Sequence, residues 1–285
     1  MRSLRMLSNF HTHTNYCDGK GDAQTYAVRA ETLGLTSLGF SSHAPLPFDC
    51  AWCMQESQLP EYLRALKTIR SQLKNVELYI GLEVDYIPNV TGPGKFRAEL
   101  DYTIGSIHFA DQLPNTKHWE IDGSFEVFKE GLALLFTNNI KDAVARYFEL
   151  TREMIRTDCP TIVGHLDKIK IHNKHQSLFS ESDDWYQQQV TQTLDELARQ
   201  GAFLEVNTRG IYQGKTIEPY PGWRALLYAY QKKIPIVLNS DAHHPDQLIQ
   251  EFLSVMQSLA KIGYRESMVL RQGSWQAVPL TPKAN

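Results

Sequence analysis

Seven short apolar segments recur along the chain, and a histidine or an acidic residue follows most of them directly. These segments cover residues 7–10, 37–40, 77–82, 102–107, 161–164, 202–206 and 234–239. Short, almost wholly apolar runs are typical of strands that are covered on both faces of a sheet. This pattern restricts the chain to architectures with a buried sheet.

Amphipathic helical patterns separate most of these segments. They cover residues 22–33, 58–73, 140–155, 183–200, 223–231 and 246–262. The second has Leu59, Leu63 and Leu66 at helical spacing, which predicts one apolar face. Gly34 and Gly201 follow two of the patterns, and glycine is a common residue just after a helix. We expect strand and helix to alternate throughout the chain, which predicts a parallel sheet with right-handed crossovers, and thus an α/β fold.

Two polar segments, 44–56 and 111–123, are expected to be loops, and the second is long enough to carry function. The tail, residues 267–282, is expected to form a hairpin that turns at Gln272-Gly273. A length of 285 residues allows one barrel or two smaller domains. Because no repeat or flexible linker divides the chain, we expect one domain over residues 1–285.

Charge and composition limit the classes of partner. Lys and Arg number 29 against 32 Asp and Glu, which leaves a net charge of −3. A nucleic-acid binder is more often basic, so a small substrate is favoured over nucleic acid. The N-terminus lacks an apolar core long enough for a signal peptide, and no run approaches the ~18 apolar residues of a membrane span. Four scattered cysteines do not form a secreted disulfide framework. We expect a cytoplasmic protein without a membrane partner, and the sequence does not indicate its oligomeric state.

Metal-competent side chains lie at the ends of six of the seven predicted strands. They are His11, His13, Asp18, His43, Glu83, His108, His165, Asp241 and His243. His11 and His13 are two residues apart, so an extended backbone points them to the same side. In a (β/α) barrel the carboxyl ends of all strands open on one face, where such enzymes place their chemistry. We therefore expect these residues to converge at one mouth.

This set contains six histidines and three carboxylates. Imidazole and carboxylate together suit Zn²⁺, Mn²⁺ or Fe²⁺, and the absence of thiolate argues against a structural zinc site. Nine ligands are enough for three divalent ions, with Glu83 as a bridging carboxylate. Paired metals stabilise the attacking and leaving oxygens in phosphoryl transfer, so hydrolysis is the expected reaction.

The sixth strand ends differently, in Asn207-Thr208-Arg209-Gly210. A guanidinium at the mouth of a barrel can hold a phosphate through paired hydrogen bonds, so Arg209 is a candidate substrate-binding residue. Lys168 and Lys170 follow the fifth strand and are weaker phosphate candidates, for which a solvated loop charge is the plain alternative. His244 is a candidate substrate contact that otherwise points away from the site.

Several residues have a plausible structural role instead. Asp18 could cap the helix that begins near Asp22 or hold the turn at Gly19. Asp85 is given no metal role, and His118, His172 and His175 are expected on the surface or in loops. Cys50 and Cys53 form an isolated Cys-x₂-Cys pair, which we interpret as structural. Phe48 and Trp52, in the same loop, could wall the pocket.

The ordered blocks resemble the polymerase and histidinol phosphatase (PHP) superfamily, and specifically its histidinol-phosphatase branch. The matching blocks are His11-Thr12-His13-Thr14 with Asp18-Gly19, Ser42-His43-Ala44-Pro45, Gly81-Leu82-Glu83-Val84-Asp85-Tyr86, Ser106-Ile107-His108-Phe109, Val163-Gly164-His165 and Ser240-Asp241-Ala242-His243. They run from the first predicted strand to the last. The resemblance implies a distorted (β/α)7 barrel with a trinuclear metal centre at the C-terminal ends of its strands.

The resemblance also implies an activity, namely hydrolysis of the phosphomonoester L-histidinol phosphate in histidine biosynthesis. It puts the nine residues above at ligand positions, with Glu83 bridging; Asp18 stands where relatives often have histidine. A metal-bridging hydroxide would attack phosphorus in line, and Glu83 and Asp241 are the expected catalytic carboxylates. Asp241 or a nearby acid could protonate the leaving group.

Two other functions fit the same residues. A related phosphoesterase could act on nucleotides or on DNA 3′ ends, although the near-neutral charge disfavours long nucleic acid. A metal-loaded regulatory module without catalysis is the other alternative, but its signature would be a degenerate site. Every ligand position here holds a metal-competent residue.

Overall fold

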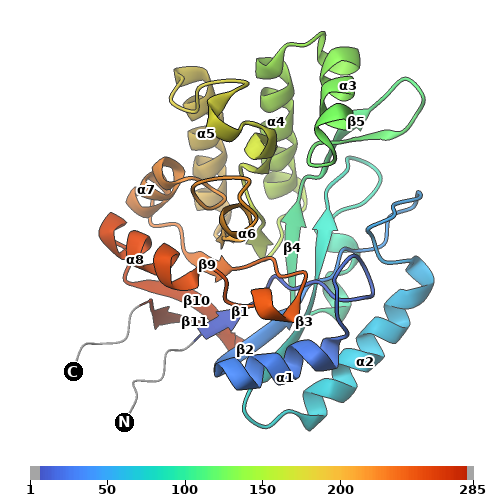
Figure 1. Ribbon diagram of the computed structural model, residues 1–285, viewed down its shortest axis with the longest axis vertical. Coiled ribbons are helices and arrows are strands. Elements are labelled where there is room, and N and C mark those ends of the chain that lie inside the picture. Colours follow the sequence, from blue (N-terminus) through green and yellow to red (C-terminus); the bar gives the residue numbers. More distant parts are fainter. Residues whose placement is uncertain (1–6, 281–285) are drawn as a thin grey trace.

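The computed structural model describes residues 7–280 (Figure 1). Residues 1–6, where a signal peptide was sought, lie outside this range, as do the last two residues of the expected hairpin segment. Within the range, seven parallel strands form one sheet in the order β1-β2-β3-β4-β7-β8-β9. Their bounds are Leu7–Asn9, Leu35–Phe40, Glu77–Asp85, Tyr102–Ser106, Ile162–Val163, Phe203–Asn207 and Ile236–Asn239. All seven predicted strands are present.

The sheet curves until its first and last strands meet. The backbone N–H of His13 donates to the carbonyl of Ala242 at 2.8 Å, and the N–H of Ala242 donates to the carbonyl of His11 at 3.0 Å. Below this contact, side-chain amides replace the backbone ladder: Phe10 N–H donates to Asn239 Oδ1 at 2.8 Å, and Ser240 N–H to Asn9 Oδ1 at 3.1 Å. The result is the predicted distorted (β/α)7 barrel.

The six predicted helices are present within the described residues and surround the strands (Figure 1). They are α1 (Ala23–Leu33), α2 (Leu59–Gln72), α4 (Ile140–Thr157), α5 (Asp184–Gln200), α7 (Trp223–Gln231) and α8 (Phe252–Ile262). Asp22 caps α1 by accepting the N–H of Thr25, and Gly34 ends it in the left-handed conformation at φ 71°. α8 begins later than predicted, because a 3₁₀ turn over Pro245–Gln247 and a positive φ at Glu251 precede it.

The alternation of strand and helix is wrong at one place. Between β3 and β4 the described chain has only two 3₁₀ turns, Pro93–Lys95 and Arg97–Glu99. Gly94 N–H donates to Asp158 Oδ1 at 2.8 Å, which ties this connection to the end of α4. Pro88, Gly92, Pro93 and Gly94 interrupt this stretch, and proline and glycine disfavour the interior of a helix.

Part of the expected loop 111–123 is instead a small hairpin, β5 (Phe109–Gln112) with β6 (His118–Glu120). A helix that the pattern did not predict, α3 (Phe125–Phe136), packs on it. Trp119 of β6 is fully buried against Phe128, and Gly131 lets the helix approach the indole closely. A three-residue strand carries no periodic signal, which is why the sequence suggested a loop.

The expected C-terminal hairpin is present as β10 (Glu266–Arg271) and β11 (Ser274–Pro279). Its turn residues Gln272 and Gly273 have φ values of 50° and 73°, the positive values that a type I′ turn requires. The ring centroid of Trp275 lies 5.1 Å from that of Phe10 and 4.8 Å from that of Phe203. Because Phe203 begins β8, the hairpin closes the amino-terminal end of the barrel and leaves the carboxyl ends open.

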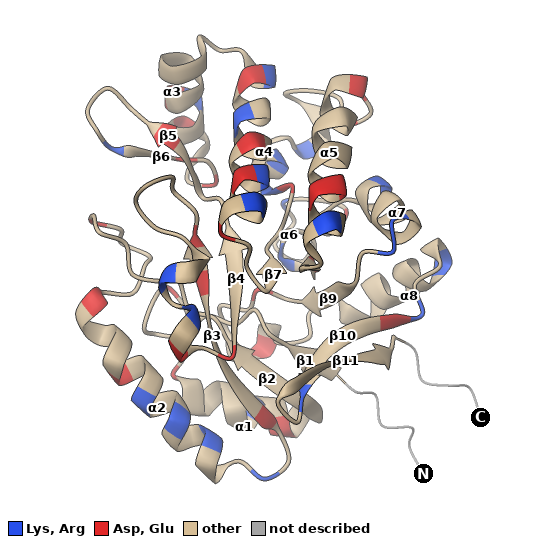
Figure 2. Cartoon of the chain, turned by 180° about the vertical axis from the view of Figure 1, so that it is seen from behind, with Lys and Arg blue, Asp and Glu red and all other residues tan. Residues whose placement is uncertain are grey.

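Acidic and basic residues are interspersed on α2, α4 and α5 in the view of Figure 2. Among residues 7–280, no helix has both the length and the apolar character needed to cross a membrane.

Candidate metal centre

All nine predicted ligands converge at the carboxyl ends of the strands. Their ligand atoms fall into four overlapping groups, each with its atoms within 4.8 Å of one another. The groups are His13, Asp18, His43 and His243; His11, His13 and Glu83; His11, His165 and Asp241; and His43, Glu83 and His108. The overlap means that several neighbouring cation sites can share ligands.

Glu83 lies at the centre of the cluster and is 1% exposed. Its Oε2 lies 3.1 Å from His11 Nε2 and 3.0 Å from His43 Nδ1. Its Oε1 faces the other side, 2.9 Å from His165 Nε2 and 3.6 Å from His108 Nε2. Each carboxylate oxygen therefore faces a different set of imidazoles, the arrangement that a bridging ligand needs.

Asp241 joins the cluster from the loop after β9. Its Oδ1 lies 3.2 Å from His13 Nε2 and 3.4 Å from His243 Nδ1. Its backbone is in the left-handed region at φ 54°, which is unusual for a residue with a side chain. Strained backbone of this kind concentrates at functional sites, where the surrounding structure holds it.

Asp18 lies at the open edge of the cluster, with its side chain 36% exposed. Its Oδ2 is 3.1 Å from His243 Nε2, and its Oδ1 is 3.8 Å from His43 Nε2. The helix cap considered for it is supplied by Asp22 instead. The structure thus groups Asp18 with the histidines.

Several buried atoms of this cluster make no hydrogen bond of normal geometry among the described residues: His11 Nε2, His13 Nε2, His43 Nδ1, His165 Nδ1 and Asp18 Oδ1. Of these, His11 Nε2 faces a carboxylate oxygen of Glu83, and His13 Nε2 faces one of Asp241. A buried polar atom without a partner costs free energy. Imidazole nitrogens and carboxylate oxygens are also the donor set that divalent transition metals prefer. The residues present therefore fit divalent metal ions.

Two further carboxylates orient the histidines. Glu205 of β8 is fully buried, and its Oε1 lies 2.6 Å from His11 Nδ1. It also accepts the N–H of His165 at 2.7 Å and the side-chain amide of Asn239 at 2.9 Å. A carboxylate on the second imidazole nitrogen fixes the tautomer and raises the ligand's basicity. The sequence analysis missed Glu205, although an acidic residue in the middle of an apolar strand was a usable signal.

Asp85 has the same relation to His108. Its Oδ1 accepts the backbone N–H of His108 at 2.9 Å and lies 3.1 Å from His108 Nδ1. Burial alone would lower the pKa of His108, but the Asp85 carboxylate raises it to about 9. Asp85 was given no metal role from the sequence, and its orienting role was not predicted.

The charges of the cluster stabilise one another. Burial alone would raise the pKa of Glu83, yet the imidazoles of His11 and His43 hold it well below its usual value. The pKa of Asp241 is likewise held low against burial by His11 and Arg209. Both carboxylates are therefore ionised, as metal ligands must be.

A cavity of about 250 Å³ opens beside the cluster. Ligand side chains such as Asp18, His43, His108, Asp241 and His243 form one wall. Trp52, Glu120, Asp122, Lys168, His172, Arg209, Lys215 and Tyr220 are among the other lining residues. The cavity thus combines a cluster of metal-competent side chains with cationic and acidic ones.

Of the predicted substrate contacts, Arg209 lines this cavity, and its Nη1 donates to the carbonyl of Asp241 at 2.9 Å. Lys168 lines it as well, with Nζ 2.9 Å from Asp122 Oδ2 and 3.3 Å from His108 Nε2. Lys170 does not line it and lies in a neighbouring cavity. His244 is exposed, and its Nδ1 accepts the N–H of Asp246.

The loop after β2 supplies an aromatic wall. The ring of Trp52 lies 4.5 Å from that of His43 and 5.3 Å from that of His108. Phe48 stacks on His118 at 4.2 Å, farther from the cluster. His172, expected on the surface or in a loop, lies at the end of the 3₁₀ turn Lys168–His172 and lines the cavity.

Comparisons with known proteins agree with this geometry. The family model of the PHP domain matches residues 9–209. The probable histidinol-phosphatase of Deinococcus radiodurans is 29% identical over 269 residues, which covers 91% of this chain and 95% of the relative.

Two solved structures have the same fold. A candidate histidinol phosphatase from Listeria monocytogenes superimposes with a TM-score of 0.77 at 22% identity, covering 87% of this chain and 99% of that one. The histidinol phosphate phosphatase of Lactococcus lactis, solved with zinc, L-histidinol and phosphate, has a TM-score of 0.69 at 18% identity and covers 95% and 99%.

Proposed function

The chain belongs to the PHP domain family, and from this premise we propose that it is a metal-dependent phosphatase that hydrolyses L-histidinol phosphate to L-histidinol and phosphate, in histidine biosynthesis. The observation that carries the proposal is the cavity beside the ligand cluster, in which Arg209 and Lys168 face the same space as the metal-competent side chains. The Deinococcus and Lactococcus relatives, named for this reaction, support the choice of substrate.

We propose that the cluster holds three divalent ions, with Zn²⁺, Mn²⁺ and Fe²⁺ as the candidates. The four overlapping ligand groups and the position of Glu83 between them support more than one ion. Bound divalent metals supply an activated water and positive charge for the phosphoryl oxygens. Glu83 and Asp241 would hold these ions together with the histidines, and Glu205 and Asp85 orient His11 and His108 for that role.

The charged side chains of the cavity suit a substrate with a phosphate at one end and an ammonium group at the other. Arg209 and Lys168 would bind the phosphate oxygens, since guanidinium and ammonium groups are strong phosphate donors. Asp122 Oδ1 is buried without a hydrogen-bond partner among the described residues, and Glu120 lies beside it in the cavity wall. These carboxylates would receive the substrate ammonium, and Trp52 offers its ring to the imidazole.

The carboxylates of the cluster are ionised and have no proton to donate. Because the pKa of Asp241 is held well below its usual value, its side chain cannot protonate the leaving alkoxide, but it can accept a hydrogen bond from the attacking water. Lys168 Nζ lies 3.3 Å from His108 Nε2, so its ammonium group lies beside the ligand cluster and can donate to the leaving oxygen. We therefore assign Lys168 to the leaving group, and we assign Asp241 to the orientation of the attacking water.

The test is phosphate release from L-histidinol phosphate, compared with p-nitrophenyl phosphate and a nucleoside monophosphate, in the presence of Mn²⁺, Zn²⁺ or Fe²⁺. We expect L-histidinol phosphate to have the highest kcat/KM and chelation to abolish release. Glu120→Gln should raise KM for L-histidinol phosphate about tenfold while leaving p-nitrophenyl phosphate unchanged. Equal turnover of all substrates would contradict the substrate assignment but not the hydrolytic chemistry.

Action on nucleotides or DNA 3′ ends is the competing activity. The nucleoside monophosphate in the panel tests the first, and digestion of single-stranded DNA tests the second. A metal-loaded protein that releases no phosphate from any of them would favour the regulatory module.

A further inference from the structure

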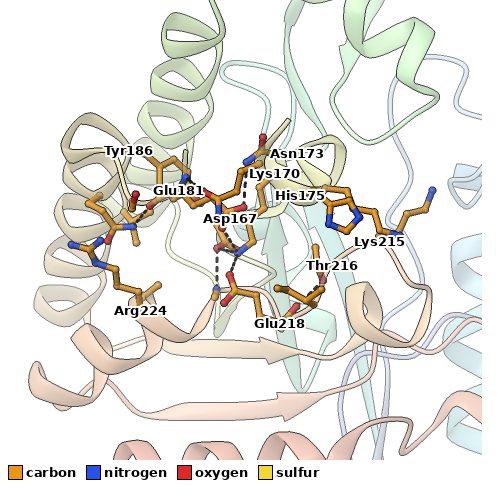
Figure 3. Close-up of a pocket in the computed structure, with 18 residues that line it drawn as sticks. Asp167, Lys170, Asn173, His175, Glu181, Tyr186, Lys215, Thr216, Glu218 and Arg224 are labelled. Atoms are coloured by element: carbon orange, nitrogen blue, oxygen red, sulfur yellow. Dashed lines mark hydrogen bonds and ion pairs between the residues drawn. The ribbon is translucent and has the colours of Figure 1, made fainter. Parts of the chain in front are cut away.

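A second cavity, of about 300 Å³, lies outside the metal centre (Figure 3). Its walls come from the 3₁₀ turns after β7, from the first half of α5, and from the segment that links α6 (Arg209–Tyr212) to α7. Ligand pockets in proteins commonly begin at about this volume, so the cavity suits a small molecule.

The floor of this cavity is an ion cluster with excess negative charge. Lys170 is 2% exposed, and its Nζ lies 2.9 Å from Asp167 Oδ2, 3.2 Å from Glu181 Oε2 and 2.7 Å from Glu218 Oε1. One ammonium therefore faces three carboxylates. Figure 3 shows Lys170 between Asp167 and Glu218, so the lysine expected to bind phosphate is already occupied by acidic partners.

Two buried polar atoms of the lining residues have no hydrogen-bond partner among the described residues. They are Asp167 Oδ1 and the hydroxyl of Tyr186, both on side chains that are 2% exposed. Each costs free energy unless a donor or acceptor reaches it. A ligand ammonium would supply donors to both the carboxylate and the hydroxyl.

The entrance has the opposite charge. Lys174, Lys215 and Arg224 line the cavity and are exposed. Lys174 donates to the carbonyl of Gly214 at 2.7 Å, whereas Arg224 makes no side-chain hydrogen bond or ion pair within the described part of the chain. A free guanidinium at the entrance can pair with a carboxylate through two parallel hydrogen bonds.

We propose that this second cavity binds a free α-amino acid, with its ammonium group at Asp167 and Tyr186 and its carboxylate at Arg224. An acidic floor and a basic entrance match a zwitterion, whereas a simple cation would leave Arg224 unpaired and a simple anion would face the floor carboxylates.

The second cavity shares a wall with the metal centre. Asp167 and Lys170 line the second cavity, and His165 and Lys168, in the same short segment, line the first. Lys215 lines both. An amino acid that restrains this segment also restrains Lys168 in the phosphate pocket, so its binding is expected to change KM for the phosphorylated substrate.

The experiment is calorimetric titration of the full-length, metal-loaded protein with a panel of free L-amino acids that differ in side-chain size. We expect at least one to bind with a dissociation constant below about 1 mM. Its methyl ester, which lacks the carboxylate, and its deaminated acid, which lacks the ammonium, should each bind at least about tenfold more weakly. These analogues test the proposal on the unaltered protein.

Two variants locate the site. Arg224→Ala and Tyr186→Phe should each weaken amino-acid binding about tenfold and leave kcat without the amino acid unchanged. Arg199→Ala, an exposed arginine of α5 outside the cavity, is the matched control and should bind normally.

Three results would overturn the proposal. The first is that no amino acid of the panel binds at concentrations up to about 10 mM, and the second is that the methyl ester binds as tightly as the amino acid itself. In the third, inorganic phosphate would compete with the amino acid, which would place the ligand in the metal centre. Because binding is read by heat rather than by turnover, a failure of the phosphatase assignment would leave this result unaffected.

Discussion

Glu83 and Glu205 show how two buried glutamates of one barrel take different tasks. Glu83 directs each oxygen toward a different set of histidines and is available to metal ions. Glu205 has both oxygens satisfied by protein donors, with Oε1 on His11 and Asn239 and Oε2 on the backbone of His165. We propose that the first is a metal ligand and that the second is a positioning residue.

The substitution Glu205→Gln tests this division. It keeps the size of the side chain but leaves one acceptor oxygen in place of two, so the side chain can no longer accept from both His11 Nδ1 and the N–H of His165. Partners of this kind are typically worth about 10–100-fold in metal affinity or activity. We expect a loss of that size at limiting metal, measured as phosphate release during a metal titration, with partial recovery at excess metal.

Glu149→Gln is the matched control for this substitution, because Glu149 lies on the exposed face of α4 with its side chain 58% exposed. It should leave the metal titration unchanged. A Glu205→Gln protein with the wild-type metal titration would show that His11 needs no orienting carboxylate.

The convergence of the nine ligand candidates could be predicted from the sequence because they follow strands, and strand ends in a barrel share one face. His11, Glu83 and His165 are far apart in the chain yet needed only this rule. Glu120 and Asp122 could not be predicted, because they reach the cavity through a small hairpin with no periodic pattern. The prediction that Lys170 binds phosphate was wrong for a related reason. The sequence gives the position of a strand end but not the direction of a side chain in the turn that follows the strand.

At the scale of elements, the β10–β11 hairpin closes the end of the barrel opposite the metal centre. Trp275 contacts Phe10, Phe203 and Tyr102, which come from three different strands or strand ends. Val269, Leu270 and Val278 of the hairpin belong to the same buried cluster. The hairpin therefore forms part of the hydrophobic core of the barrel.

Trp275→Ala should destabilise the fold without altering the ligand set. Removal of a large aromatic side chain from such packing costs about 3 kcal/mol in the free energy of unfolding. Denaturant unfolding of the metal-loaded protein measures it, and Leu253→Ala, at a side chain that is 53% exposed, is the control. If the two variants were equally stable, the hairpin would not support the barrel.

Most helices and strands could be predicted because each has a clear cap or period. Asp22 and Gly34 mark the two ends of α1 on the sequence alone. α3 was not predicted although it has local signals: Ser124 caps it by accepting the N–H of Val127, and Phe128, Leu132 and Leu135 recur at helical spacing. The prediction of a helix between β3 and β4 was wrong, because strand and helix were assumed to alternate even where the sequence has no helical period.

At the scale of the molecule, the metal centre is also a source of stability. Six imidazoles and three carboxylates are held together at the open end of the barrel, and several of their atoms lack partners. The unfolded chain does not hold them together, so metal binding favours the folded state. The single-domain organisation and the cytoplasmic location stay predictions.

Chelation should therefore lower stability as well as activity. A metal present at about 100 times its dissociation constant adds about 2.7 kcal/mol to the free energy of unfolding. We expect the melting temperature to fall on dialysis against a chelator and to recover on addition of Mn²⁺ or Zn²⁺. In the His243→Ala variant, chelation should lower the melting temperature less than in the native protein. In the control variant His175→Ala, at an exposed histidine, chelation should lower it by as much as in the native protein. An unchanged melting temperature of the native protein after chelation would contradict metal binding.

The seam between β1 and β9 is held by two backbone hydrogen bonds and by the side-chain amides of Asn9 and Asn239. The ligands nearest it, His11 and His13 on one side and Asp241 and His243 on the other, belong to opposite ends of the polypeptide. Cations bound between them would join the beginning of the chain to its end. Removal of the metal ions would then first loosen the barrel where β1 meets β9. The protein would lose its reaction centre and the closure of its barrel together.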